Sequence, residues 1–242
     1  QNISFTVQRG ETRIILGPPG GGKSMLMKLP NGLIKPDTGT IRVFVEDVTD
    51  MLARDLFKLR GRIGMVFQES ALFDSLSVAD NVAFRLHEER VPEEEVRARV
   101  VEALRFVELE QAIDKFPAEL SGGMRRRVSI ARAIVSRPDL ILYDSPTGGL
   151  DPITSTTIVE LVVKQRDVTH TTSLLITHRL QDAFLLARNR FNQHTGQMEP
   201  IPDGGVDNST KFLVLNEGRI VFDGTTRELI GTNDPWLKEY IS

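Results

Sequence analysis

The stretch Gly17-Pro18-Pro19-Gly20-Gly21-Gly22-Lys23-Ser24 decides how this chain folds. It fits the pattern G-x-x-x-x-G-K-[ST], in which glycines let successive backbone N–H groups turn inward on phosphate oxygens. A strand-like run at 13–16 precedes it and a helical pattern at 24–29 follows, which disfavours a merely flexible glycine turn. Lys23 would add positive charge at the β- and γ-phosphates, and the Ser24 hydroxyl would coordinate Mg²⁺. The stretch therefore predicts an α/β nucleotide-binding domain that takes ATP and Mg²⁺.

A second informative stretch is Leu140-Ile141-Leu142-Tyr143-Asp144-Ser145, an apolar run that ends in a carboxylate. On its own, an aspartate after an apolar strand is usually a loop residue. Because the glycine loop lies upstream in the same chain, we expect Asp144 to hold Mg²⁺, directly or through water. The next residue is Ser145, at the position where a carboxylate base would be expected. The groups that bind ATP are therefore present, whereas this position has no side chain able to activate water.

The composition is that of an ordinary globular domain, with 40% hydrophobic and 26% charged residues. A net charge of −3 gives no general reason to expect nucleic acid or an anionic membrane surface as a partner. The chain contains no cysteine, which excludes disulfides and thiolate metal sites and fits a reducing cytosol. No apolar stretch approaches the ~20 residues that cross a bilayer, and no segment resembles a signal peptide. We therefore expect no direct membrane insertion, and any membrane association to come through a partner.

Strand-like and helical patterns alternate along the chain, as in an α/β domain built on a parallel sheet. The expected strands are 3–7, 13–16, 41–45, 62–67, 139–143, 173–177, 211–215 and 219–222, the last two joined by the hairpin signal Asn216-Glu217-Gly218. The chain opens inside a strand and without methionine, so we expect residues upstream of it.

A helical insertion is expected between 75 and 137, where Pro92 and the acidic residues after it mark a helix start. We predict that 1–74 and 138–242 form the nucleotide-binding core and that 75–137 form a helical subdomain. Residues 188–210 are polar, contain several Gly and Pro, and show no periodicity. We predict a surface loop or partly disordered insertion there, with a partner-binding loop as the alternative.

A third stretch, Leu120-Ser121-Gly122-Gly123-Met124-Arg125-Arg126-Arg127, opens a predicted helix that Pro138 prevents from extending. Ser121 is a favourable N-cap residue. Ser-Gly-Gly at a helix start also makes an anion site from bare amides and a hydroxyl, although the glycine loop already serves the phosphates of one nucleotide. We interpret the arginine run as a solvated or ion-paired helix face rather than a nucleic-acid patch.

These motifs, in this order, resemble those of the ATP-binding cassette (ABC) ATPases from end to end. The correspondences are 17–24 with the Walker A loop, Gln68 with the Q-loop glutamine, Leu120 to Met124 with the signature LSGGQ (methionine in the last place), Asp144 with Walker B, Gly149-Leu150-Asp151 with the D-loop, and Thr177-His178 with the switch histidine. A lone glutamine or histidine would prove nothing, but the whole series in register is specific.

The resemblance implies one ABC ATPase domain over 1–242: a P-loop NTPase (RecA-like) core, an antiparallel β part and an inserted α-helical subdomain. It implies a head-to-tail homodimer that holds each ATP between 17–24 of one subunit and Ser121, Gly122 and Gly123 of the other, with Asp151 beside them. The implied Mg²⁺ ligands are Ser24, Gln68 and Asp144, and the implied catalytic positions are Gln68, Ser145 and His178. ATP binding would close the dimer and hydrolysis would open it, driving a transmembrane permease at the cytoplasmic face of the inner membrane.

Finer features resemble one subfamily, the ATPases of Mla- and Mce-type lipid (organic solvent resistance) transport systems. They are Ala71-Leu72-Phe73-Asp74-Ser75-Leu76-Ser77-Val78, Asp80-Asn81-Val82-Ala83-Phe84, the signature ending in Met124, and the tail Asn233-Asp234-Pro235-Trp236. The resemblance implies transport of phospholipids or other hydrophobic compounds.

The chain departs from the family pattern at Ser145, where the family has its catalytic glutamate. A positioned base typically contributes about 10²–10⁴-fold to a rate, whereas positioning and charge stabilisation by Lys23, Mg²⁺ and His178 would remain. We therefore expect slow hydrolysis. The alternative is an ATP-dependent dimerisation switch with little or no hydrolysis. A soluble ABC protein acting on ribosomes or DNA is disfavoured by the single cassette and the mildly acidic charge.

Overall fold

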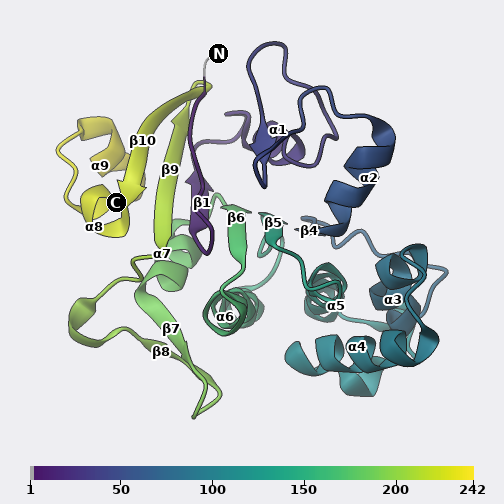
Figure 1. The fold of residues 1–242 in the computed structure, drawn as a ribbon. Helices are drawn as coiled ribbons and strands as arrows, with labels where there is room; N and C mark the ends of the chain where they lie inside the picture. The colour runs from purple at the N-terminus through teal and green to yellow at the C-terminus, as the bar shows by residue number, and fades with distance from the viewer. Residues whose placement is uncertain (1–2) are drawn as a thin grey trace. The chain divides into compact units, whose positions relative to one another are not determined.

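The computed structural model describes residues 3–242, which fall into two compact units (Figure 1). The first unit comprises Gln1–Ser24 and Asp151–Ser242, and the second comprises Met25–Leu150. Over residues 3–242, no helix is both long enough and apolar enough to cross a membrane.

The first unit is built on a mixed sheet with helices and a separate hairpin. Its elements are β1 (Thr12–Leu16), α6 (Pro152–Thr169), β6 (Thr172–Ile176), α7 (Leu180–Arg188), β7 (Asn189–Asn192), β8 (Gln197–Pro200), η3 (Pro202–Gly204), β9 (Thr210–Asn216), β10 (Arg219–Thr225), α8 (Thr226–Ile230) and α9 (Pro235–Ile241). The strand order is β10-β9-β1-β6, and α8 and α9 lie beside β10 (Figure 1). β1 pairs in parallel with β6 and β9, whereas β9 and β10 are antiparallel. The expected α/β fold with an antiparallel β part is therefore confirmed.

Strand β1 lies between β9 and β6, and all of its residues are buried. Ile14, Ile15 and Leu16 have no exposed surface, as expected of a parallel strand covered on both faces. The chain leaves this buried strand directly into the glycine loop, so the sheet fixes where the loop begins.

The second unit combines a short parallel strand pair with most of the helices of the chain. Its elements are α1 (Lys23–Lys28, which starts in the last residues of the first unit), β2 (Arg42–Val43), β3 (Glu46–Asp47), α2 (Ala53–Gly61), β4 (Ile63–Val66), α3 (Val78–Glu88), α4 (Glu93–Phe106), η1 (Glu110–Ala112), η2 (Pro117–Glu119), α5 (Gly122–Ile134) and β5 (Leu140–Asp144). β4 and β5 pair in parallel, and α3, α4 and α5 stand between them in the chain. The division into a core and a subdomain at 75–137 stays a prediction.

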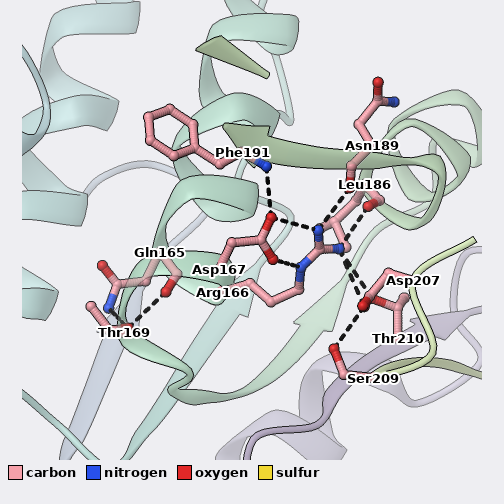
Figure 2. Close-up of polar contacts among 10 residues, drawn as sticks. All are labelled: Gln165, Arg166, Asp167, Thr169, Leu186, Asn189, Phe191, Asp207, Ser209 and Thr210. Carbon is pink, nitrogen blue, oxygen red and sulfur yellow. Dashed lines mark hydrogen bonds and ion pairs between the residues drawn. The ribbon is translucent and has the colours of Figure 1, made fainter. Parts of the chain in front are cut away.

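The prediction of a loop or partly disordered insertion is wrong for residues 189–200 of the 188–210 segment, because β7 and β8 form an antiparallel hairpin there; the alternative of a partner-binding loop stays a prediction. The anchor of the hairpin is Arg166 of α6, which forms an ion pair with Asp167 and donates to the carbonyl oxygens of Leu186 and Asn189 at 2.8 and 2.7 Å (Figure 2). The Phe191 N–H donates to Asp167 Oδ2 at 2.7 Å. The hairpin is thus held by polar contacts rather than by an apolar face, which is why the sequence shows no strand periodicity.

Two expected strands are shorter or absent. The strand expected at 41–45 is only Arg42–Val43, because Phe44 and Val45 adopt left-handed φ values of 51° and 65° and turn the chain into β3. The usual Asn or Gly signal for such a turn is missing there. The strand expected at 3–7 does not form. Its alternating burial is present, but the Thr6 carbonyl accepts from the Arg13 side chain at 3.1 Å rather than joining a ladder. Residues 1 and 2 lie outside the described residues.

Tyr143 of β5 carries a buried hydroxyl group that a single substitution can remove. Its side chain is fully buried, its hydroxyl has no hydrogen-bond partner among residues 3–242, and burial raises the pKa of the phenol. Because an unsatisfied buried hydroxyl costs about 1–3 kcal/mol, Tyr143→Phe should raise the free energy of unfolding by about 1 kcal/mol or more. Urea denaturation measures this change. A less stable variant would show that a bound water satisfies the hydroxyl.

Candidate nucleotide-binding site

The glycine loop at 17–24 lies in the first unit, and its glycines take backbone conformations that the predicted phosphate cradle requires. Gly17, Gly20 and Gly22 have φ values of 145°, 77° and 87°, which side-chain-bearing residues rarely adopt. A Cβ at Gly17 would also lie 2.2 Å from the carbonyl oxygen of Leu215 on β9. Glycine is therefore required where β1 ends and the loop begins.

Lys23 is buried and points back along this loop. Its Nζ donates to the carbonyl oxygens of Gly17 and Pro18, both at 2.8 Å. The Gly21 N–H donates to the same Pro18 carbonyl at 3.3 Å, which closes the loop into a tight turn. The ammonium group is therefore held inside the curve of the loop, where it can meet the charge of a phosphate.

The rest of the predicted cradle is open to a ligand. Pro19, Gly20, Gly22 and Ser24 are exposed, and Ser24 follows Lys23 in the first turn of α1. The Ser24 hydroxyl is thus accessible at the position predicted to hold Mg²⁺.

Two further predicted residues lie in the first unit. Asp151 is the N-cap of α6: its Oδ1 accepts from the Thr154 N–H at 3.0 Å, and hydrogen bonds from Thr154 lower the pKa of the carboxyl. Helix capping by itself accounts for an aspartate at this position, so a contact between Asp151 and a nucleotide stays a prediction. His178 follows β6 and is exposed.

The predicted Q-loop and Walker B residues lie in the second unit at one edge of a parallel strand pair. β4 and β5 are in register from Ile63 with Leu140 to Val66 with Tyr143. Asp144 is the last residue of β5, and Gln68 lies two residues after the end of β4, so both lie at the carboxyl ends of neighbouring strands. Ligand-binding residues of open α/β sheets gather at this edge. Ser145 comes next, with a left-handed φ of 48° and only 7% of its surface exposed.

Arg126 of helix α5 joins these segments. Its guanidinium donates to the carbonyl oxygens of Phe67 (3.1 Å), Gln68, Ser145 (3.2 Å) and Gly148 (3.3 Å). The side chain is 4% exposed, and desolvation lowers the pKa of its guanidinium, which still stays charged at neutral pH. Arginine presents several donors in a rigid fork, so one side chain can fix several backbone oxygens at once.

Arg132, further along α5, extends the same clamp. It donates to the carbonyl oxygens of Ser70 and Ala71 at 2.9 and 2.7 Å. Both residues have left-handed φ values, 64° and 47°, which turn the chain sharply after Gln68. We call the backbone of residues 67–71 held by Arg126 and Arg132 the arginine-clamped Q-loop. The prediction that the arginine run is a solvated or ion-paired face is wrong at Arg126, which is buried against carbonyl oxygens.

The signature residues open α5 as the sequence predicts. Ser121 is the N-cap, and its hydroxyl accepts from the Met124 N–H at 3.2 Å. Ser121 and Gly122 are exposed and Gly123 is half-buried. The same helix therefore carries the exposed signature residues at its start and the arginine clamp on its buried side.

The comparisons with known proteins decide the family. Residues 1–148 match the family described as ABC transporter. The chain belongs to the ABC transporter family. The expected resemblance to the ABC family is thereby confirmed.

Individual members of the ABC transporter family match to different extents. The methionine import ATP-binding protein MetN 1 of Bacillus thuringiensis subsp. konkukian is 42% identical over 180 residues, which cover 74% of this chain and 53% of that protein. The chain thus spans about half the length of such relatives. The intermembrane phospholipid transport system ATP-binding protein MlaF of Haemophilus influenzae is 32% identical over 241 residues, covering 99% of this chain and 83% of that protein. The expected similarity to Mla-type ATPases is therefore confirmed.

A solved ABC structure supports the fold independently. A dimeric ATP-binding cassette in a post-hydrolysis state, bound to ADP and phosphate, superposes with a TM-score of 0.77 at 29% sequence identity. The match covers 93% of this chain and 89% of that chain.

Sequence reasoning missed the contacts of Arg126 and Arg132 with the backbone around Gln68. Arginine next to arginine on a helix normally indicates a solvated face. The available signal was the group of apolar residues that follows the arginines: Val128, Ile130 and Ala131 are buried, so much of α5 faces the protein interior. No pattern indicated which atoms the guanidinium groups would bind.

Proposed function

We propose that this chain is the ATP-binding subunit of an ABC transporter that moves phospholipid or other hydrophobic compounds through a partner permease. The choice of cargo rests on how much of this chain each relative matches. The match to the phospholipid transport protein MlaF extends over 241 residues, whereas the match to the methionine import protein extends over 180. We place the chain at the cytoplasmic face of the inner membrane, where it would be held by the permease.

The loop at 17–24 would bind the ATP phosphates, with Lys23 as the cation that meets them. Ser24, Gln68 and Asp144 fit Mg²⁺, because this ion usually takes one or two protein carboxylates and completes its shell with phosphate and water. When bound, Mg²⁺ would neutralise charge on the transferring phosphoryl group.

A second copy of the chain would complete the site. Ser121 and Gly122 are exposed at the start of a 13-residue helix, as an anion site for a nucleotide carried by another subunit requires. The solved relative bound to ADP and phosphate is a dimer. These two observations support a head-to-tail homodimer that closes on ATP.

Slow hydrolysis is the second part of the proposal. Ser145 cannot act as a general base at neutral pH, whereas Lys23 and His178 remain to position and stabilise the phosphoryl group. ATP binding would then close the dimer readily, and hydrolysis would open it slowly. The alternative, a dimerisation switch that does not hydrolyse ATP, shares every binding group and differs only in turnover.

A permease would dock on exposed aromatic side chains of the second unit. Phe57, Phe73 and Phe84 are 44%, 42% and 41% exposed, and we call them the phenylalanine patch. The rings of Phe73 and Phe84 lie 4.7 Å apart, and Arg85 lies over the ring of Phe57. Apolar side chains gathered at a surface mark protein interfaces. Because Phe73 follows the arginine-clamped Q-loop by two residues, a partner on this patch would act next to Gln68.

A role on ribosomes or DNA receives no support from the arginine residues. Arg125, Arg126 and Arg127 all donate to backbone carbonyl oxygens within the second unit. The net charge of −3 also gives no electrostatic reason for nucleic-acid binding.

Reconstitution tests the proposed cargo. The chain would be purified with the membrane protein that accompanies it and placed in vesicles that contain fluorescent phosphatidylethanolamine, with radiolabelled methionine assayed in parallel. We expect ATP-dependent movement of the phospholipid that is lost in Lys23→Ala. ATP-dependent methionine uptake without lipid movement would contradict the proposed cargo, and recovery of the chain only with ribosomes or DNA would contradict the transport role.

A further inference from the structure

The last helix of the chain contacts the first residue of the phosphate loop. The Gly17 N–H donates to the Tyr240 hydroxyl of α9 at 2.9 Å, although the two residues are 223 positions apart. Gly17 is also the residue whose missing Cβ leaves room for the Leu215 carbonyl. The junction between β1 and the loop is therefore fixed from two sides, by β9 and by α9.

The contact continues from Tyr240 towards Lys23. The Gly17 carbonyl oxygen accepts from Lys23 Nζ at 2.8 Å, while the Gly17 N–H is bound to Tyr240. One residue thus carries a hydrogen bond to the C-terminal helix on its amide and a hydrogen bond to the phosphate-binding lysine on its carbonyl. If Tyr240 moves, the peptide groups on either side of Gly17 turn, and the carbonyl oxygen that Lys23 binds turns with them.

Tyr240 is itself held in place. Its ring stacks on Trp236 with centroids 5.2 Å apart and an interplanar angle of 4°. α9 is capped by Asp234, whose Oδ1 accepts from the Leu237 N–H at 2.9 Å, and Leu237 is buried. Partial burial raises the pKa of Tyr240, so its hydroxyl stays protonated at neutral pH.

We propose that Tyr240 is a positioning residue of the ATP site. Its hydroxyl fixes the backbone at Gly17, where the phosphate loop starts, and so couples the C-terminal helix to the position of the Lys23 ammonium group. This inference rests on the proposed role of 17–24 as the phosphate loop. Preorganising a loop lowers the ordering cost of binding, so loss of the hydroxyl weakens ATP binding without removing any group that touches the nucleotide. Trp236 is the only tryptophan of the chain, so its fluorescence reports on α9.

The experiment compares the unmodified chain with Tyr240→Phe, which keeps the ring on Trp236 and removes only the hydroxyl. Calorimetry with a slowly hydrolysed ATP analogue and Mg²⁺ gives the Kd. Trp236 emission is followed in a parallel titration with the same analogue. We expect Trp236 emission of the unmodified chain to change on binding. In Tyr240→Phe we expect a Kd about two- to tenfold higher, the range that one hydrogen bond spans, and a reduced Trp236 response. The kcat at saturating ATP should stay within about twofold, since no transition-state contact is removed.

Lys238→Ala is the matched control, because Lys238 lies on α9 and is exposed. It should leave both the Kd and the Trp236 response unchanged. An unchanged Kd in Tyr240→Phe would overturn the inference even if the melting temperature fell, since the hydroxyl would then be structural only. Failure of the unmodified chain to bind the analogue would instead overturn the proposed phosphate loop, and the inference with it.

Discussion

Ser145→Glu is expected to raise the steady-state rate of ATP hydrolysis by about 10²–10⁴-fold, the usual contribution of a positioned general base. The hydrogen bonds that hold the backbone at Ser145 use its carbonyl oxygen, which every residue has. That oxygen accepts from Arg126 Nη1 at 3.2 Å and from the Gly148 N–H at 2.9 Å. A new side chain keeps these two hydrogen bonds, but it enters a position that is 7% exposed and has a left-handed φ of 48°, so the free energy of unfolding of Ser145→Glu is measured alongside its rate. The measurement is release of phosphate by the purified chain with Mg²⁺.

Ser145→Gln is the control for this prediction, since glutamine has the length of glutamate and no basic carboxylate. It should remain as slow as the unmodified chain, and Lys23→Ala should abolish turnover in either background. If the unmodified chain already hydrolyses ATP as fast as Ser145→Glu, a different group activates the water and the slow-hydrolysis hypothesis fails.

The oligomeric state gives a second consequence of the same substitution. If the unmodified chain hydrolyses ATP slowly, bound ATP should hold the dimer closed. A dimer should then persist through gel filtration with ATP and Mg²⁺. Ser145→Glu should shorten the lifetime of that dimer because hydrolysis opens it. In this interpretation ATP binding, rather than turnover, sets how long the proposed permease is held in one state.

The fold was predictable where apolar patterns specify it. The buried run of β1, the glycine loop after it and the Asn216-Glu217-Gly218 turn all carry strong local signals, and the structure has each of them. The turn at Phe44 and Val45 was not predictable, because neither residue favours a left-handed φ. The Phe44 ring instead lies under the Arg62 guanidinium, 4.0 Å from the ring centroid, a tertiary contact that no local pattern contains.

Part of the site was predictable for the same reason, and part was not. Residues that bind phosphate do so through local geometry, so the loop and the Ser121 cap are visible in the sequence. Arg126 and Tyr240 act through backbone groups far away in the chain, and any residue can supply such a group. Sequence indicates that an arginine or a tyrosine is present, but the acceptor or donor that it meets is set by the packing of α5 and α9.

Arg126→Met is expected to lower the free energy of unfolding by roughly 3–5 kcal/mol, a large share of the total of a typical protein. The substitution keeps an apolar stem but removes the guanidinium donor from four buried carbonyl oxygens, those of Phe67, Gln68, Ser145 and Gly148. The oxygens of Phe67 and Ser145 keep a backbone N–H donor, from Ser70 and Gly148. Hydrogen bonds to charged groups contribute about 1.5–3 kcal/mol each, and four on one side chain are not additive. Urea denaturation measures the loss.

Arg125→Met is the matched control, because Arg125 is exposed and donates to the Leu120 carbonyl oxygen. It should cost about 1 kcal/mol or less. Arg126→Lys should fall between the two, since an ammonium cannot reach all the oxygens that the guanidinium fork spans. This variant should also bind ATP while turning it over more slowly, because Gln68 would lose its fixed backbone. Equal stabilities of Arg126→Met and Arg125→Met would show that the clamp contributes nothing, and α5 would then carry the signature motif without positioning the Q-loop.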